Sequence, residues 1–183
     1  HRRNGETAER LAEEMAVIAE IGRLIGSTLD INEVYERFAA EARKLILFDR
    51  LSVNLNSPHD DILTVAYVYG AEVPGRAPGN SFPLTGTMSE ALMRTRAGLI
   101  FHPATVEEMA SRFPGLVPGF DAGVRSLMSV PLISRDRVMG ALHFRAKKPD
   151  AYTEQDLRLA ERIGAQIAGA VANAQLFADL KKT

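Results

Sequence analysis

Alternation of apolar and polar residues in three stretches limits the fold of this chain more than any other feature. Successive side chains of a strand point to opposite faces of a sheet. One predicted face is apolar and comprises Leu51, Val53, Leu55, Met128, Val130, Leu142 and Phe144. The residues one step out of phase are polar: Ser52, Asn54, Ser129, His143 and Arg145. The sequence therefore predicts a sheet whose two faces meet different surroundings.

Three segments with a helical period supply a partner for the apolar face. They cover about residues 6–29, 30–47 and 153–180, and each carries a stripe of apolar side chains. Asp30 and Thr153 are good N-caps for the second and third of these helices. Strands are predicted at 51–55, 62–69, 125–133 and 138–146, as two hairpins. We expect the three helices to pack on the apolar face of an antiparallel sheet.

The segment 70–123 is the only part of the chain left to cover the polar face. It is rich in Gly and Pro, and Thr87 and Thr105 are placed to cap two short helices. A short apolar strand is predicted between them, at 99–101. A polar floor under such a lid predicts a pocket for a small molecule. The alternative is that the Phe and Met side chains of the lid collapse onto the floor and fill the space.

Eight residues are candidates for the lining of this pocket: Ser52, Asn54, Ser129 and His143 from the floor, Phe82, Thr85 and Phe101 from the lid, and Arg125 beside the lid. His143 could donate a hydrogen bond to a ligand, bind haem or titrate near neutral pH, and a hydrogen-bonded packing histidine is the alternative. Arg125 could hold an anionic ligand with two hydrogen bonds. The alternative is a surface arginine or one paired with Asp121.

The first predicted helix carries its apolar residues in a narrow stripe that suits pairing with another helix. Leu11, Met15, Ile18 and Ile25 recur at steps of three and four, with Gly22 completing the series. We predict a homodimer joined through the terminal helices, and a helix packed on its own domain is the alternative. Residues 1–29 are assigned to a signalling or dimerisation helix, 30–177 to the main domain and 178–183 to the start of a linker helix. The chain opens on His1, so we expect a longer parent protein that carries an effector domain.

Composition excludes several functional classes. The net charge is -1, whereas binding to phosphate backbones needs a basic excess, so no nucleic-acid partner is predicted. The chain has no Cys, which excludes disulfides, thiolate nucleophiles and Cys-linked chromophores and fits a reducing compartment such as the cytoplasm. No window holds the roughly 18 apolar residues of a membrane span. The sequence has no catalytic motif and its histidines lack metal-ligand spacing, so neither an enzyme nor a metal site is expected.

Four short motifs follow one another in an order and spacing that resemble a GAF domain: SLMSVPL at 126–132, GAL at 140–142, YTEQDL at 152–157 and ANAQLF at 172–177. The resemblance covers about residues 30–177. It implies an α+β fold of the GAF and PAS type, with an antiparallel sheet of five to six strands between a layer of N- and C-terminal helices and a lid with short helices. GAF domains are sensory modules of larger proteins such as histidine kinases of two-component systems, cyclases and transcriptional regulators, and many are homodimers.

The chain lacks residues that are typical of three functional subgroups of GAF domains. GAF relatives that reduce methionine sulfoxide, and those that attach a bilin of the phytochrome type, use cysteines that are missing here. GAF domains that bind cyclic nucleotides have Asn-Lys, then Phe, three residues and Asp-Glu. Here Tyr152 replaces the Phe, Leu157 replaces the Glu, and Arg145 with Ala146 stands near the Asn-Lys position. A cyclic nucleotide is therefore not favoured, and the sequence names no cofactor.

These observations predict a non-catalytic, cytoplasmic sensor domain. It would bind a small molecule under its lid and pass the signal through the terminal helices to an effector. The alternative is a domain with a filled pocket that serves only for dimerisation and relay.

Overall fold

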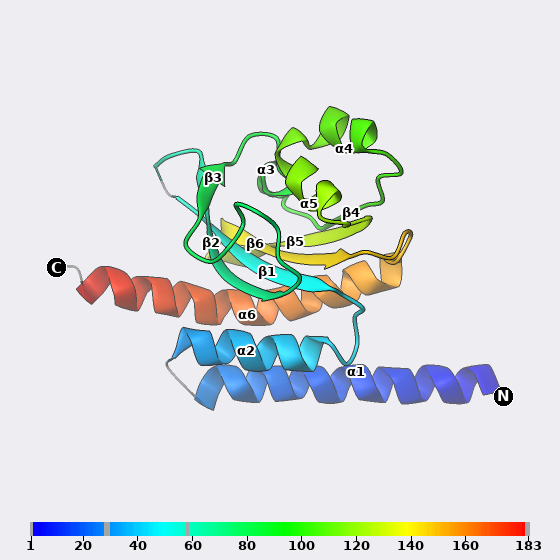
Figure 1. Cartoon of the computed structure of the whole chain (residues 1–183). Coiled ribbons are helices and arrows are strands. Elements are labelled where there is room, and N and C mark those ends of the chain that lie inside the picture. The colour runs from blue at the N-terminus through cyan, green and yellow to red at the C-terminus, as the bar shows by residue number, and fades with distance from the viewer. Residues whose placement is uncertain (1, 28–29, 58, 182–183) are drawn as a thin grey trace.

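The alternating segments form strands and the amphipathic segments form helices in a computed structural model of the chain, which describes residues 2–27, 30–57 and 59–181 (Figure 1). In chain order the elements are α1 (Arg2–Ser27), α2 (Ile31–Ala42), β1 (Arg50–Asn56), β2 (Ile62–Gly70), β3 (Ser81–Pro83), α3 (Met88–Thr95), β4 (Leu99–Phe101), α4 (Val106–Arg112), the 3-10 helix η1 (Pro114–Leu116), α5 (Val117–Asp121), β5 (Ser126–Ser134), β6 (Arg137–Ala146) and α6 (Glu154–Lys181). The ends of the assigned segments 1–29 and 178–183 lie outside the described residues.

The strands form one antiparallel sheet in the order β3-β2-β1-β6-β5-β4, which confirms the predicted α+β fold. The two predicted hairpins, β1–β2 and β5–β6, join through the central β1–β6 pair. In this register Ser52 stands opposite His143, and His143 stands opposite Ser129. The polar face predicted from three separate segments is therefore one continuous row across three strands.

A bulge in β2 changes which side chains of this strand point to each face of the sheet. Val53 pairs with Tyr67 and the next residue, Asn54, pairs with Val65, so Ala66 is the extra residue. Tyr67 consequently lies on the helical side, where its ring stacks on Tyr35 of α2 with centroids 5.2 Å apart. Val65 lies on the other side, under the lid.

The three long helices lie on the apolar side of the sheet, as predicted (Figure 1); α2 and α6 contact the strands, and α1 packs mainly on α2 and α6. Leu51, Val53 and Phe144 are completely buried there. They belong to one hydrophobic cluster with Phe38 of α2 and Ile163 of α6. Burying side chains of this size contributes about 1.5–3 kcal/mol each to the stability of the fold.

Helix α2 ends earlier than predicted, at Ala42 rather than near residue 47. Beyond it the Lys44 and Leu45 amides bond to carbonyls three residues back. This tighter turn brings Ile46 and Phe48 into the core. Asp30 caps the start as predicted, because its carboxylate accepts a hydrogen bond of 3.0 Å from the Asn32 amide.

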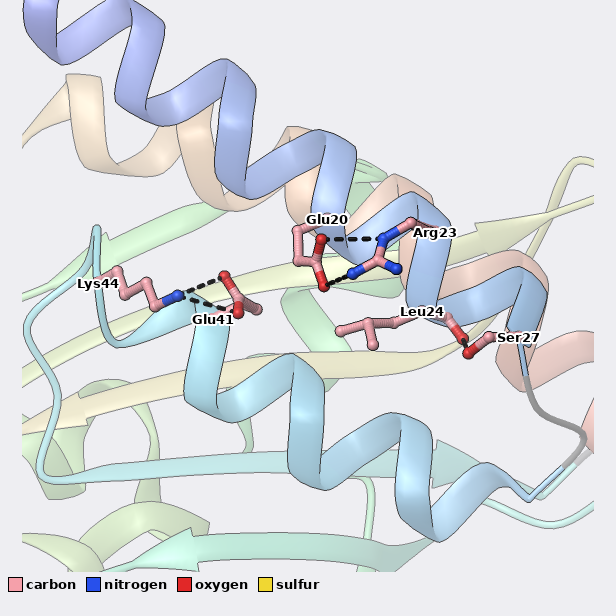
Figure 2. Close-up of polar contacts among 6 residues, drawn as sticks. All are labelled: Glu20, Arg23, Leu24, Ser27, Glu41 and Lys44. Carbon is pink, nitrogen blue, oxygen red and sulfur yellow. Dashed lines mark hydrogen bonds and ion pairs between the residues drawn. The ribbon is translucent and has the colours of Figure 1, made fainter.

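Helix α1 is held by its C-terminal half. Val17 and Ile21 belong to the main cluster, and Leu24 is also buried. Gln166 of α6 donates a hydrogen bond of 3.1 Å to the Ile18 carbonyl. Figure 2 shows three polar contacts in α1 and at the end of α2, each between residues three apart: Arg23 pairs with Glu20, Lys44 with Glu41, and the Ser27 hydroxyl donates to the Leu24 carbonyl. Exposed pairs of this kind contribute about 0–1 kcal/mol, so apolar packing holds α1 in place.

The lid has a small core of its own. Phe101 and Phe113 meet edge to face with centroids 5.3 Å apart, and Met88, Met109, Val124 and Leu127 complete the cluster. The two predicted lid helices and the strand β4 are present, whereas β3, η1 and α5 were not predicted. Thr105 caps α4 as expected. Thr87 stands at the N-cap position of α3 as expected, but its side chain accepts no capping hydrogen bond; its hydroxyl donates to the Leu84 carbonyl at 2.7 Å.

Candidate functional site

A cavity of about 50 Å³ lies between the polar face of the sheet and the lid. Strands β1 and β6 contribute its floor, and α3, α4 and the loops beside them contribute its roof. The polar residues that line it are Arg50, Ser52, Asn54, Arg76, Thr87, Ser89, His143 and Arg145. The lid therefore does not fill the whole space over the polar face.

His143 is the centre of the hydrogen-bonded floor. Its Nδ1 lies 2.7 Å from the Ser129 hydroxyl and 3.1 Å from the Arg145 guanidinium, and its Nε2 lies 3.3 Å from the Ser89 hydroxyl of α3. A guanidinium can only donate, so Nδ1 accepts and the proton of the neutral ring sits on Nε2. Burial, together with the charges of Arg145 and Arg50, holds the pKa of His143 well below its usual value of 6.5. The floor and the lid are joined through this neutral imidazole.

Arg50 and Arg145 stand opposite each other on β1 and β6 and are 5% and 8% exposed. Arg50 donates to the carbonyls of Ala71 and Arg76, at 2.9 and 2.8 Å. Arg145 donates to the Ser129 hydroxyl at 3.0 Å and to the Phe144 carbonyl at 3.2 Å. Both guanidiniums are therefore held in place by neutral acceptors.

Arg76 brings a third guanidinium to the cavity from the loop after β2. Its Nη2 donates to the Gly115 carbonyl at 2.8 Å, and its Cζ lies 3.7 Å from the centre of the Phe82 ring. These contacts tie the loop to η1 and β3, so they connect two sides of the lid. Nearby, Asn54 is 7% exposed, and its Oδ1 has no hydrogen-bond partner among the described residues.

Four of the eight predicted ligand residues line the cavity: Ser52, Asn54, Phe82 and His143. A fifth, Ser129, is completely buried and bonded to His143 and Arg145, so it supports the floor. The ligand-binding role of these residues remains a prediction.

The other three predicted residues lie elsewhere. Thr85 is exposed, because the left-handed turn at Gly86 (φ 82°) lies between it and Thr87, which does face the cavity. Phe101 belongs to the lid core, since β4 pairs with β5 and not with β1 or β6. Arg125 donates to the carbonyls of Phe120 and Val124 and stacks on the Phe120 ring, rather than facing the cavity or pairing with Asp121.

Sequence reasoning missed Arg50, Arg76, Thr87 and Ser89 as lining residues, and it placed Arg145 on the polar face without including it in the pocket. Arg50 could have been found, because it continues the alternation of Ser52 and Asn54 by one step toward the N-terminus. Arg76 and Ser89 carry no periodic signal. Their positions depend on how the lid folds back over the sheet.

The four residues predicted for a dimer seam divide into two pairs. Leu11 and Met15 are 51% and 59% exposed. Ile18 and Ile25 are partly buried and pack against the core of their own domain. Within one chain, α1 thus uses its C-terminal half for the domain and leaves apolar side chains exposed toward its N-terminus.

In the described parts of the chain, no three His, Cys, Asp or Glu side chains come together as metal ligands would. None of the described helices is long and apolar enough to cross a membrane.

A six-stranded antiparallel sheet with long helices on one face and a lid over a cavity on the other defines an α+β domain of the sensory GAF type. The family description of the GAF domain matches residues 28–172. The chain therefore belongs to the GAF family. GAF domains are in general regulatory sensor modules.

Known relatives and solved structures agree with this assignment. The formate hydrogenlyase transcriptional activator FhlA of Escherichia coli is 21% identical over 174 residues, which are 94% of this chain and 25% of that protein. The GAF domain of a phosphoenolpyruvate-protein phosphotransferase from Acinetobacter has a TM-score of 0.70, with 19% identity, 91% of this chain and 97% of that chain covered. The GAF domain of a two-component sensor histidine kinase from Bacillus halodurans has a TM-score of 0.66, with 16% identity, 82% and 99% covered. The chain thus spans about a quarter of the length of the transcriptional activator that it matches.

Proposed function

We propose that this domain is the non-catalytic sensory module of a larger regulatory protein and that it binds a small molecule in the cavity under its lid. The observation that carries the proposal is the lining of that cavity, where buried polar side chains from β1 and β6 face Thr87 and Ser89 of the lid. A ligand that touches both layers favours the closed lid over an open one, which is the differential affinity that a population shift requires.

The strands that form the floor of the cavity also contact the helices, so they can pass a structural change from the ligand to the helices. Ser52 faces the cavity, while its neighbours Leu51 and Val53 are completely buried in the helical core. A ligand that displaces β1 therefore also displaces side chains packed against α2 and α6. Helices α1 and α6 lie on the far side of the sheet from the lid (Figure 1), and they carry the signal to an effector in the same polypeptide.

The relatives support a regulatory parent protein. One of them is a transcriptional activator much longer than this chain, and one similar structure is a domain of a two-component sensor histidine kinase. We accordingly assign the parent to this kind of signalling protein. The absence of Cys supports a reducing, cytoplasmic location.

A second candidate function is a ligand-free dimerisation and relay domain. Exposed Leu11 and Met15 favour it, since large apolar side chains that recur on one helix face suit pairing with a second copy. In this function the cavity would be incidental, and the signal would arrive through the helices alone.

Native mass spectrometry of the purified chain, followed by denaturation in the same instrument, separates the two candidates. Ser52→Leu is the matched test variant, because it fills the cavity from the floor, and Ser52→Ala is its control. A small-molecule adduct on the wild type and on Ser52→Ala, lost in Ser52→Leu, is the result we expect. A dimer without any adduct, whose melting temperature responds to no compound in a panel of ions and neutral metabolites, would contradict the sensor and leave the relay.

A further inference from the structure

The cavity is lined by three arginines and by no acidic residue. Arg50, Arg76 and Arg145 take part in none of the ion pairs that form within the described ranges. Arg50 and Arg145 are buried and Arg76 is partly exposed. Buried charges are normally paired, because desolvation costs several kcal/mol per ion. The chain itself therefore leaves a surplus of positive charge around this cavity.

The positions of Arg50 and Arg145 raise the electrostatic cost of this surplus charge. Arg50 and Arg145 are direct cross-strand neighbours on the same sheet face, an arrangement in which like charges destabilise a sheet. Burial lowers the pKa of Arg145 to about 9, and the charge of Arg50 adds to this effect. Burial and the charge of Arg76 also lower the pKa of Arg50. An anion between the guanidiniums would relieve the repulsion and replace part of the lost hydration.

Hydrogen-bond donors remain for such an anion. A guanidinium has five N–H groups, and Arg50 donates only two hydrogen bonds, both to main-chain carbonyls. Arg76 likewise donates two, to the carbonyls of Gly75 and Gly115. Main-chain anchoring of this kind holds a guanidinium in place for two-point recognition of an oxyanion. The Asn54 side chain, whose Oδ1 is unpaired among the described residues, adds an amide that can turn either end toward the ligand.

The volume limits the size of the ligand. A cavity needs roughly 10–15 Å³ on this scale to hold one water, so about 50 Å³ accommodates about three to five non-hydrogen atoms. A nucleotide or a tetrapyrrole is far larger. A carboxylate with one to three carbons, or an inorganic oxyanion such as nitrate, has the right size.

We propose that the ligand of this domain is a small oxyanion, a short-chain carboxylate or an inorganic anion of similar size, held between the guanidiniums of Arg50, Arg76 and Arg145. This inference rests on the proposed sensor function and gives its ligand a chemical class. Neutral His143 then holds the Arg145 guanidinium in position through its Nδ1 and links the floor to Ser89 of the lid through its Nε2.

The test is the melting temperature of the full chain at constant ionic strength, with sodium gluconate as the background salt because gluconate is too large for the cavity. Acetate and nitrate are the probes, acetamide is the neutral isostere of acetate, and benzoate is a carboxylate of excessive size. We expect acetate or nitrate to raise the melting temperature by on the order of 5–10 °C at a hundredfold excess over Kd, and acetamide and benzoate to leave it unchanged.

Two variants assign the effect to the arginines. Arg145→Gln removes one guanidinium of the site, and we expect it to abolish the rise with acetate and nitrate. Arg37→Gln removes the same charge from the exposed surface of α2, where Arg37 pairs with Glu33, and should retain the full rise. If Arg145→Gln does not fold, Arg76→Gln in the lid loop replaces it. The comparison of acetate with acetamide on the wild type needs no variant at all.

The outcomes distinguish this inference from the sensor function. An equal rise with acetamide and acetate, or a rise with acetate that Arg145→Gln retains, would overturn anion recognition and leave a ligand pocket standing. No response to either anion would also overturn it. The sensor function itself fails only if neutral compounds are without effect as well and the native chain carries no adduct.

Discussion

The guanidinium of Arg145 donates a hydrogen bond of 3.1 Å to Nδ1 of His143, two residues before it on β6. Because both side chains lie on the lid face of the strand, the arginine decides the tautomer of the histidine. The proton is left on Nε2, which faces the Ser89 hydroxyl of α3 at 3.3 Å. A buried imidazole held in this way is a structural link between floor and lid, as the packing interpretation of His143 proposed.

The depressed pKa of His143 makes stability depend on pH. Below the ordinary value of about 6.5 the unfolded chain binds a proton that the folded chain does not, so the free energy of unfolding falls as the pH falls. The slope from this group approaches about 1.4 kcal/mol per pH unit. We expect His143→Gln to remove this part of the slope, measured by urea unfolding between pH 7.5 and 5.5. His59→Gln, at an exposed position, should retain it, and equal slopes for the wild type and His143→Gln would refute the assignment.

Gly140 has no room for a side chain. A Cβ there would lie 2.1 Å from the carbonyl oxygen of Asn54 on the neighbouring strand. We expect Gly140→Ala to separate β1 from β6 and to lower the free energy of unfolding by about 2 kcal/mol or more. Gly22→Ala in α1 is the matched control, because its Cβ would meet Gln166 at an ordinary 3.7 Å. That variant should gain about 0.5–1 kcal/mol from helix propensity, and a loss at Gly22 similar to that at Gly140 would argue against this register.

The dimer seam is tested at Leu11 and Met15, since Ile18 and Ile25 pack on their own core and charges there would disturb the domain. If the exposed pair joins two copies, Leu11→Glu with Met15→Glu gives monomers in sedimentation velocity, with an unchanged free energy of unfolding at low concentration. Met93→Glu, a 39% exposed position on α3, should leave the dimer intact. If the double variant sediments as a dimer like the wild type, then Leu11 and Met15 of α1 do not form the dimer interface.

The local elements were predictable because their signals are local. Alternation over Leu51 to Leu55 reads directly as a half-buried strand, and a cap such as Asp30 marks a helix start through contacts two residues away. The three-residue strand β3 and the short helices η1 and α5 after α4 were missed, since β3 forms by pairing with β2, and η1 and α5 pack on α4. The bulge at Ala66 was likewise invisible, because it depends on the register with β1.

The sequence by itself determined the α+β class, the apolar and polar faces of the sheet, the segment that covers the polar face, and the absence of thiol chemistry. Each of these follows from periodicity or composition, which are properties of neighbouring residues in the chain. Only the tertiary structure decided that Arg50, Arg76 and Arg145 share one cavity. The reason is physical: they come from β1, a loop and β6, and the pairing Arg50–Arg145 and the fold of the lid over it are set by packing between distant segments. The same packing separated Thr85, Phe101 and Arg125 from the site that their residue types had suggested.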